Sequence, residues 1–265
     1  VDIVPGRGPV ISEPIRDAGG VARLEPKRLQ ESLTYVAEAV DSLRSELAVP
    51  LLGFTGAPFT VASYLVEGGP SKNYALTKAM MLRESSLWHA LMEQLVELSF
   101  GFSSLQVAHG AQAVQVFDSW AGSLSPRHYR TYVKPHMVEL FRRLEDLEVP
   151  TIHFGVGTAA LITEMSDMRI SVLGLDWRTP ITSAVGATGG RVGIQGNLDP
   201  TVILAGREAT LSEAEAVLVD SRPAERYVFN LGHGVLPETD PGILTELVGF
   251  VHEHGVMIRS GGSTS

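Results

Sequence analysis

The stretch Arg226-Tyr-Val-Phe-Asn-Leu-Gly-His-Gly234 decides how the rest of the chain is interpreted. It opens with a short, largely apolar run typical of a buried β-strand and ends on a histidine between two glycines. Glycine adds no core volume, but it allows a sharp bend and a close approach. Imidazole has an unperturbed pKa nearer to neutrality than that of any other side chain. His233 is therefore a candidate site residue, with an ordinary surface histidine in a loop as the alternative.

Five further strands are predicted upstream, in a pattern of six βα units. Each strand is short, continuous and apolar, which is typical of parallel strands buried on both faces. The predicted strands are 49–54, 111–117, 150–154, 170–176, 191–196 and 226–230. Helices are predicted at 26–48, from Pro58 to a break at Gly68, at 72–108 in two pieces, and at 125–147, 210–220 and 240–253, with Gly255 as the final stop. The first ten residues are expected to form a loop, and about 257–265 a flexible tail.

Polar side chains follow nearly every predicted strand. In an open parallel sheet only the strands at the switch point need to supply such groups, whereas in a barrel every strand end faces one mouth. The distribution favours a (β/α)8 TIM barrel formed by a single domain over residues 1–265. Because only six strands are predicted, we expect the first two strands to be missing from this chain. The strand ends are Phe54–Gly56, Asp118–Ser119, His153, Asp176–Arg178, Gln195–Asn197 and Asn230–His233.

Composition excludes several classes of protein and of site. The net charge of −9 argues against general nucleic-acid binding. The absence of cysteine excludes disulfides, zinc-thiolate sites, iron–sulfur clusters and a thiol nucleophile. No apolar run approaches the roughly 20 residues of a membrane span. We therefore expect a cytoplasmic protein with no membrane or nucleic-acid partner.

Six motifs together make the sequence recognisable. They are Gly53–Phe59, Ser63–Gly69, Val116–Gly122, Gly174–Trp177, Gln195–Pro200 and Asn230–Gly234. In this order and at this spacing, the chain resembles the bacterial uroporphyrinogen decarboxylase family over essentially its whole length. The resemblance implies a (β/α)8 barrel, a homodimer and an enzyme without cofactor or metal. Such an enzyme converts the four acetate side chains of uroporphyrinogen III to methyl groups, giving coproporphyrinogen III and CO2 in haem biosynthesis.

The resemblance also implies roles for individual residues. Tyr64, Ser119 and His233 fall on the family's active-site tyrosine, serine and histidine, which are expected to bind the carboxylates of the tetrapyrrole. Phe54 falls on an aromatic residue that lines the cleft. The two arginines and the aspartate that the family uses in catalysis precede the matching segment and have no counterpart here, so the catalytic residues stay unknown. We expect no measurable decarboxylation from this chain alone.

Three other interpretations stay open. The first is a catalytically inactive barrel fragment or binding protein. The second is a corrinoid-dependent methyltransferase relative of the same fold. The third is a dinucleotide-binding protein. Gly155-Val-Gly157-Thr-Ala-Ala160, with Asp176 nineteen residues beyond Gly157, imitates a dinucleotide-binding fingerprint. That pattern is weak in the middle of a βα series.

Four strand-end side chains have competing interpretations. His153 is expected to be a hydrogen-bonded residue at the barrel mouth rather than a zinc ligand. Asp118 and Asp176 are acid–base candidates, but bracing of loops and helix N-termini is favoured. Arg178 either meets a substrate carboxylate or pairs with Asp176. Elsewhere, Ser125, Asp199 and Asp240, each followed by proline, predict helix N-caps.

Overall fold

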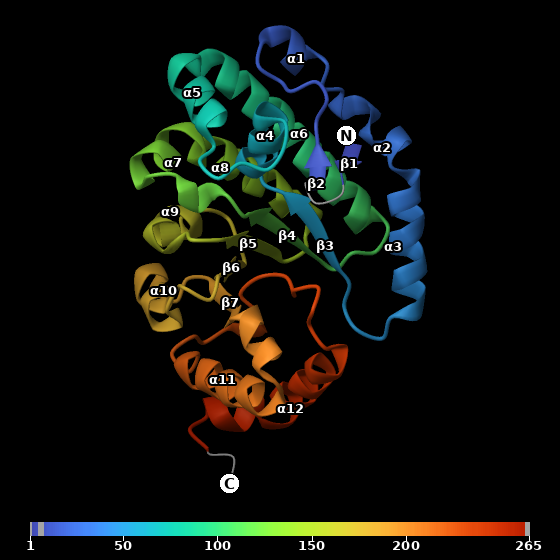
Figure 1. The fold of residues 1–265 in the computed structure, drawn as a ribbon. Coiled ribbons are helices and arrows are strands. Elements are labelled where there is room, and N and C mark those ends of the chain that lie inside the picture. Colours follow the sequence, from blue (N-terminus) through green and yellow to red (C-terminus); the bar gives the residue numbers. More distant parts are fainter. Residues whose placement is uncertain (1, 5–7, 263–265) are drawn as a thin grey trace.

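The computed structural model describes residues 2–4 and 8–262. Its centre is a sheet of six parallel strands whose spatial order, β3-β4-β5-β6-β7-β8, is the order along the chain (Figure 1). Sequential parallel strands joined through helices are the arrangement of a (β/α) barrel, as predicted. The strands are β3 Leu52–Gly56, β4 Ala113–Asp118, β5 Thr151–Gly155, β6 Val172–Gly174, β7 Gly193–Leu198 and β8 Tyr227–Leu231.

A hydrogen bond between two glutamine side chains shows that the sheet is curved. Gln195 Nε2 of β7 donates to Gln115 Oε1 of β4 over 2.9 Å, although β5 and β6 lie between these strands. Side chains of strands so far apart in a flat sheet would not meet, since neighbouring strands are about 4.8 Å apart. Both glutamines are buried. They therefore mark the interior side of the curved sheet, and the helices cover its outer side.

The two outer strands of this sheet, β3 and β8, are not paired with each other in residues 8–262. On β3, the side chain of Gln106 accepts from the backbone N–H of Phe54 over 3.0 Å and donates to its carbonyl over 2.9 Å. Phe54 is in register with Gln115, and Val228 of β8 is in register with Gln195, so both face the interior side. They are nevertheless 47% and 48% exposed. The curved sheet is open between its two edges.

Helices pack on the outer side of the sheet and enclose the main core. Large side chains without exposure fill this layer, among them Trp88, Phe59, Phe141 and Met81. A smaller core cluster of Leu198, Ala214 and Leu247 joins β7 to the last two helices. The α-helices are α1 Ala18–Ala22, α2 Leu29–Ser32, α3 Thr34–Glu46, α4 Pro58–Glu67, α5 Ala75–Arg83, α6 Ser85–Ala108, α7 Pro126–Tyr132, α8 Lys134–Leu144, α9 Ile162–Ser166, α10 Ile181–Thr188, α11 Arg207–Asp220 and α12 Pro241–Arg259.

The two ends of the chain differ from expectation. The predicted N-terminal loop contains a hairpin, in which β1 (Asp2–Val4) pairs antiparallel with β2 (Gly8–Val10); residues 1 and 5–7 lie outside the described residues. At the other end, α12 continues through Gly255 to Arg259, so the predicted helix stop is wrong. Gly255 is buried within the helix and faces α11, where a Cβ would lie 3.6 Å from Leu218. Residues 257–259 of the predicted flexible tail are therefore helical, and 263–265 lie outside the described residues.

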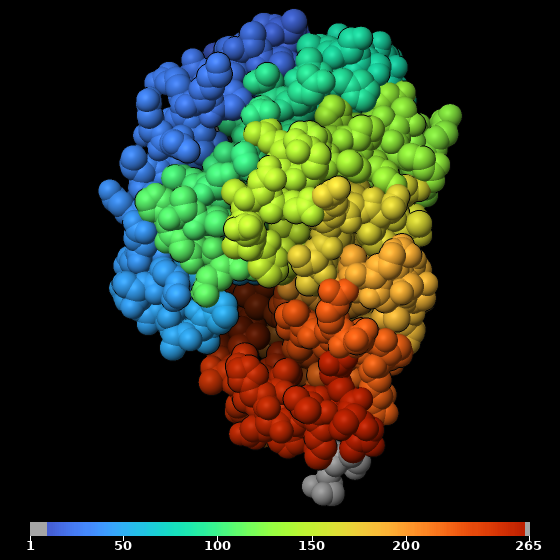
Figure 2. Space-filling model, turned by 180° about the vertical axis from the view of Figure 1, so that it is seen from behind, coloured from blue at the N-terminus to red at the C-terminus, as the bar shows by residue number. Residues whose placement is uncertain are grey.

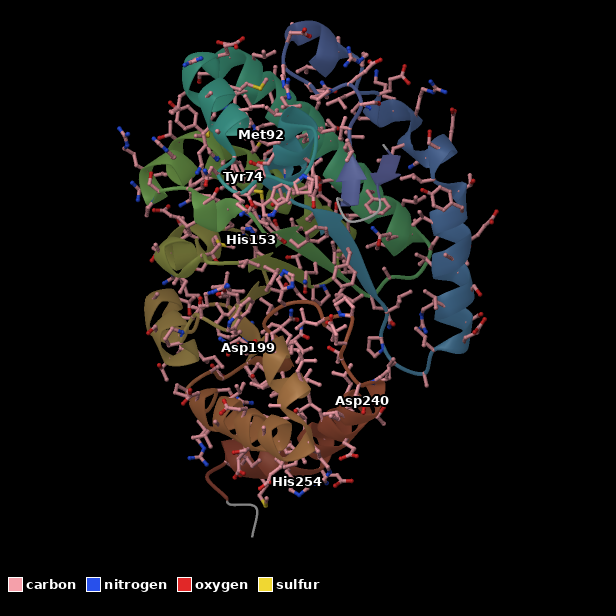
Figure 3. All side chains as sticks on the ribbon, in the orientation of Figure 1. Tyr74, Met92, His153, Asp199, Asp240 and His254 are labelled. Carbon is pink, nitrogen blue, oxygen red and sulfur yellow. The ribbon has the colours of Figure 1, made fainter. Side chains whose placement is uncertain are left out.

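Helix boundaries elsewhere follow their local sequence signals. The side chains of Ser125, Asp199 and Asp240 each accept from a backbone N–H in the first turn, which confirms the predicted N-caps (Figure 3 labels the two aspartates). Gly68 ends α4 in the left-handed conformation at φ 84°. The helix predicted at 125–147 divides at Val133 into α7 and α8. Among the described residues, no helix is long and apolar enough to cross a membrane.

Candidate active site

All six strands are parallel, so the polar residues that follow them lie at the same end of the sheet. Contacts divide these residues into two groups. The β4 group consists of Asp118, Ser119 and Trp120 with the residues that touch them, which are residues of α4 and Tyr74 directly before α5. The β8 group consists of His233 with residues 176–178, which follow β6. Within residues 8–262, no hydrogen bond, ion pair or ring contact joins His233 to Tyr64 or Ser119.

The β4 group is built around the ring of Trp120. The ring centroid of Tyr64 lies 4.1 Å from that of Trp120, and the centroid of Tyr74 lies 4.9 Å from it. Tyr74 adopts a left-handed backbone conformation at φ 52° directly before α5, and its N–H donates to Ser71 Oγ over 3.0 Å (Figure 3). Burial raises the pKa of Tyr74, and Tyr64 adds to the rise. The structure thus packs one predicted site residue, Tyr64, on Trp120, and a second, Ser119, directly precedes Trp120 in the chain.

Asp118 lies at the end of β4 with no exposed surface. Its Oδ1 accepts from Thr60 Oγ1 over 2.8 Å, and its Oδ2 has no hydrogen-bond partner. Burial raises the pKa of Asp118 to about 7, and the bond from Thr60 opposes the rise. The hydroxyl of Tyr129 is also buried without a partner. Burial holds the pKa of Tyr129 well above its ordinary value, and the Asp118 charge adds to that shift.

Asp176, which follows β6, is equally buried but has three donors. Its carboxylate accepts from Gly157 N over 3.0 Å, from Arg178 Nη1 over 2.9 Å and from Thr179 Oγ1 over 2.8 Å. This confirms the favoured interpretation of Asp176 as a brace, and of the two alternatives for Arg178 the structure shows the pair with Asp176. The aspartate of the apparent dinucleotide fingerprint thus binds the chain's own loop. A Cβ on Gly122 would lie 2.3 Å from the carbonyl oxygen of Val156, so the chain itself packs tightly against that loop.

His233 is exposed at the end of β8. Its ring meets that of Trp177 edge to face at a centroid distance of 6.3 Å, and the guanidinium of Arg178 lies 3.9 Å from the same indole. Gly232 donates its N–H to the carbonyl of Leu198, and a Cβ at this position would lie 2.4 Å from Trp177 N. The absence of a side chain at Gly232 therefore allows the loops after β8 and β6 to pack closely. Exposure at the shared end of the sheet leaves the imidazole accessible.

The prediction for His153 is wrong. This side chain has no exposed surface, it contacts the ring of Phe141 on α8, and neither ring nitrogen has a hydrogen-bond partner. It is in register with the core residues Val116 and Leu173, which places it on the helix side of the sheet rather than at the mouth. Burial lowers the pKa of His153 to about 3, a shift that the Met165 backbone opposes.

Comparison with known sequences decides the family. The sequence matches the family description "Uroporphyrinogen decarboxylase (URO-D)" over residues 1–254. It is 49% identical over 254 residues to the uroporphyrinogen decarboxylase of Salinispora tropica, and the matched region covers 96% of this chain and 68% of the relative. It is 52% identical over 262 residues to that of Mycolicibacterium paratuberculosis, with 95% and 73% covered. The chain belongs to the uroporphyrinogen decarboxylase family.

Similar solved structures agree on the fold of this family member. A methyltransferase from Methanosarcina mazei superposes with a TM-score of 0.72 at 21% identity, over 93% of this chain and 71% of that chain. A B12-independent methionine synthase from Shewanella sp. W3-18-1 superposes with a TM-score of 0.55 at 14% identity, over 84% and 66%. At such identities the likeness concerns the fold alone, so the methyltransferase interpretation is not favoured.

Sequence reasoning missed the residues that organise the β4 group of this family member. Trp120 stands inside one of the six recognised motifs, yet roles are predicted from the sequence only for Asp118 and Ser119 beside it. Thr60 and Tyr74 lie outside those motifs. A tryptophan immediately after a polar strand end was an available signal, because a large ring there needs partners from neighbouring loops.

Proposed function

We propose that this chain forms six βα units of an enzyme that decarboxylates the four acetate side chains of uroporphyrinogen III, giving coproporphyrinogen III and CO2 in haem biosynthesis. The observation that carries the proposal is the family match over residues 1–254, because it includes all six strand-end motifs. A catalytically inactive binding protein and a methyltransferase are the less favoured alternatives.

The chemistry needs an electron sink but no added cofactor. A proton added to the α-carbon of a pyrrole makes that ring cationic. The bond between the acetate methylene and its carboxylate then breaks, CO2 leaves, and the electron pair moves into the ring. A proton added to the methylene gives the methyl group, and the ring carbon releases its proton. Each acetate thus exchanges CO2 for one proton, and a negative group near the pyrrole N–H groups would stabilise the cation.

Tyr64, Ser119 and His233 are proposed to bind the carboxylates of the substrate. The ring of Tyr64 packs on Trp120, the residue after Ser119, whereas His233 contacts Trp177 in the loop after β6. Two separated sets of donors suit a large substrate with carboxylates around its rim. Each hydrogen bond to a charged carboxylate is expected to contribute about 1.5 to 3 kcal/mol. Phe54, exposed on the interior side of β3, is proposed to line the cleft.

We further propose that the active form has two additional βα units between β8 and β3. Phe54 and Val228 leave apolar surface exposed on the interior side of the two edge strands. Beside β8, an apolar hollow of about 180 Å³ is lined by residues of β8 and α12, including Phe229, Leu247 and Val251. From behind, the molecule is hollowed between the light-blue segment leading to β3 and the red C-terminal helices (Figure 2). Unpaired strand edges are an aggregation hazard, and two more strands would remove both.

These units are proposed to carry the catalytic aspartate and the two arginines of the family. The test is to assay coproporphyrinogen formation by this chain alone and by this chain joined to the family segment that contains those three residues. We expect no product from the chain alone, product from the joined form, and a raised KM for Tyr64→Phe and His233→Ala in the joined form. Product from the chain alone would contradict the additional units, and no product from a folded joined form would contradict the proposed function.

We also propose that the protein works as a homodimer in the cytoplasm, which the family resemblance supports. Light scattering of the purified chain is expected to give twice the chain mass of 28.5 kDa. A single-chain mass across the micromolar range would contradict the dimer.

A further inference from the structure

Thr60 joins a buried carboxyl group to the backbone of the β4 group. Its hydroxyl donates to Asp118 Oδ1 over 2.8 Å, and the same oxygen accepts from Trp120 N over 3.3 Å. A hydroxyl has one proton and two lone pairs. Because the hydroxyl proton is donated to Asp118, a lone pair of Thr60 Oγ1 is directed to the backbone N–H of Trp120. The carboxyl thereby fixes which way the Thr60 hydroxyl points.

Helix α4 presents Thr60 and Tyr64 four residues apart, a spacing that places two side chains on one face of a helix. Thr60 binds the backbone N–H of Trp120, and Tyr64 packs on its indole ring at 4.1 Å. One face of α4 therefore attaches to Trp120 at two points, and Trp120 is the residue directly after Ser119. Thr60 is only 3% exposed, so water does not readily replace either bond.

We propose that Thr60, oriented by Asp118, is a positioning residue that fixes Trp120 and through it the hydroxyls of Tyr64 and Ser119 for binding substrate carboxylates. The expected change in KM rests on the proposed function, whereas the expected change in the position of Trp120 does not. The alternative is that Thr60 makes an ordinary core hydrogen bond with no effect on the site.

Three variants of α4 separate these possibilities. Thr60→Val keeps the shape of the side chain but removes both hydrogen bonds, and Thr60→Ser keeps the hydroxyl. Ser63→Ala is the matched control, because Ser63 is also fully buried on α4 but donates only to the Phe59 carbonyl of its own helix. Trp120→Phe identifies the contribution of Trp120 to the near-ultraviolet circular dichroism of the full chain.

We expect Thr60→Val to alter the Trp120 part of that spectrum, Thr60→Ser to restore it, and Ser63→Ala to leave it unchanged. In the joined form, Thr60→Val is expected to raise KM about tenfold, with a smaller change in kcat, whereas Thr60→Ser stays within about twofold. An unchanged spectrum, or equal KM values for Thr60→Val and Ser63→Ala, would overturn the proposal. If the joined form lacks activity, the proposed function fails, and the spectra still decide the positioning role. Thr60→Ala repeats the test if Thr60→Val does not fold.

Discussion

Asp118 and Asp176 are both fully buried aspartates that follow strands of the same sheet, yet their carboxylates have different partners. Asp176 accepts three hydrogen bonds, one of them from the guanidinium of Arg178. Asp118 accepts one, from Thr60, and its second oxygen has none. Asp176 belongs to the β8 group and Asp118 to the β4 group.

This difference teaches that burial alone does not determine what a strand-end carboxyl does. A buried charge is tolerated when donors and an opposite charge surround it, and it is unfavourable when they do not. Asp176 therefore acts as a brace that ties the loop after β5 to the loop after β6. Asp118 keeps its proton up to about neutral pH and directs the Thr60 hydroxyl beside the site.

The largest expected effect comes from removing the brace. Asp176→Ala leaves Gly157 N and the Thr179 hydroxyl without their acceptor, and it is expected to lower the free energy of unfolding by about 3 to 5 kcal/mol. Urea unfolding measures the loss. The matched control is Asp199→Ala, which removes a helix N-cap with one backbone partner and is expected to cost about 1 kcal/mol. Equal losses for the two variants would mean that Asp176 is not a brace.

Asp118→Asn is expected to become more stable relative to wild type as pH rises, in contrast to the loss of stability expected for Asp176→Ala. Because the pKa of Asp118 rises from 3.8 to about 7 on folding, the folded chain keeps a proton that the unfolded chain releases. Wild-type stability is therefore lost as pH rises from about 4 to about 7, and asparagine does not ionise. The free energy of unfolding of Asp118→Asn relative to wild type is expected to increase over this range by about 2 to 4 kcal/mol. Unfolding curves at several pH values measure this difference. If wild type and Asp118→Asn showed parallel pH profiles, Asp118 would not have the raised pKa that sets it apart from Asp176.

A smaller effect is expected for His153, which extends the comparison to a buried group whose ring nitrogens make no hydrogen bond and whose polar neighbour is the Met165 backbone. His153→Leu exchanges two unpaired ring nitrogens for apolar atoms, and at pH 7 it is expected to stabilise the chain by about 1 to 2 kcal/mol. The pKa of His153 is lowered to about 3, so the unfolded chain takes up a proton below pH 6.5 that the folded chain refuses. Wild type should therefore lose more stability than His153→Leu as pH falls from 6.5. A destabilised variant would indicate that His153 has a hydrogen-bond partner in solution.

The sequence predicted the strand order, the polar strand ends and the N-caps at Ser125, Asp199 and Asp240, because those features depend on local periodicity and capping chemistry. It offered the local pair of Asp176 with Arg178, but it did not reveal the single donor of Asp118, because Thr60 is 58 residues away in the chain and is brought close only by the fold. His153 was misplaced because a strand apolar throughout its length does not reveal which side chains face the helices.

The most direct test of this account is the pKa of the Asp118 carboxyl, followed by its ¹³Cγ chemical shift and assigned with Asp118→Asn. The account predicts a midpoint of about 7, moved further upward by Thr60→Val, which removes the one hydrogen bond that favours the charged form. A midpoint near the ordinary value of 3.8 would contradict it. Asp118 would then have donors that match those of Asp176, and the contrast between the two halves of the site would not exist.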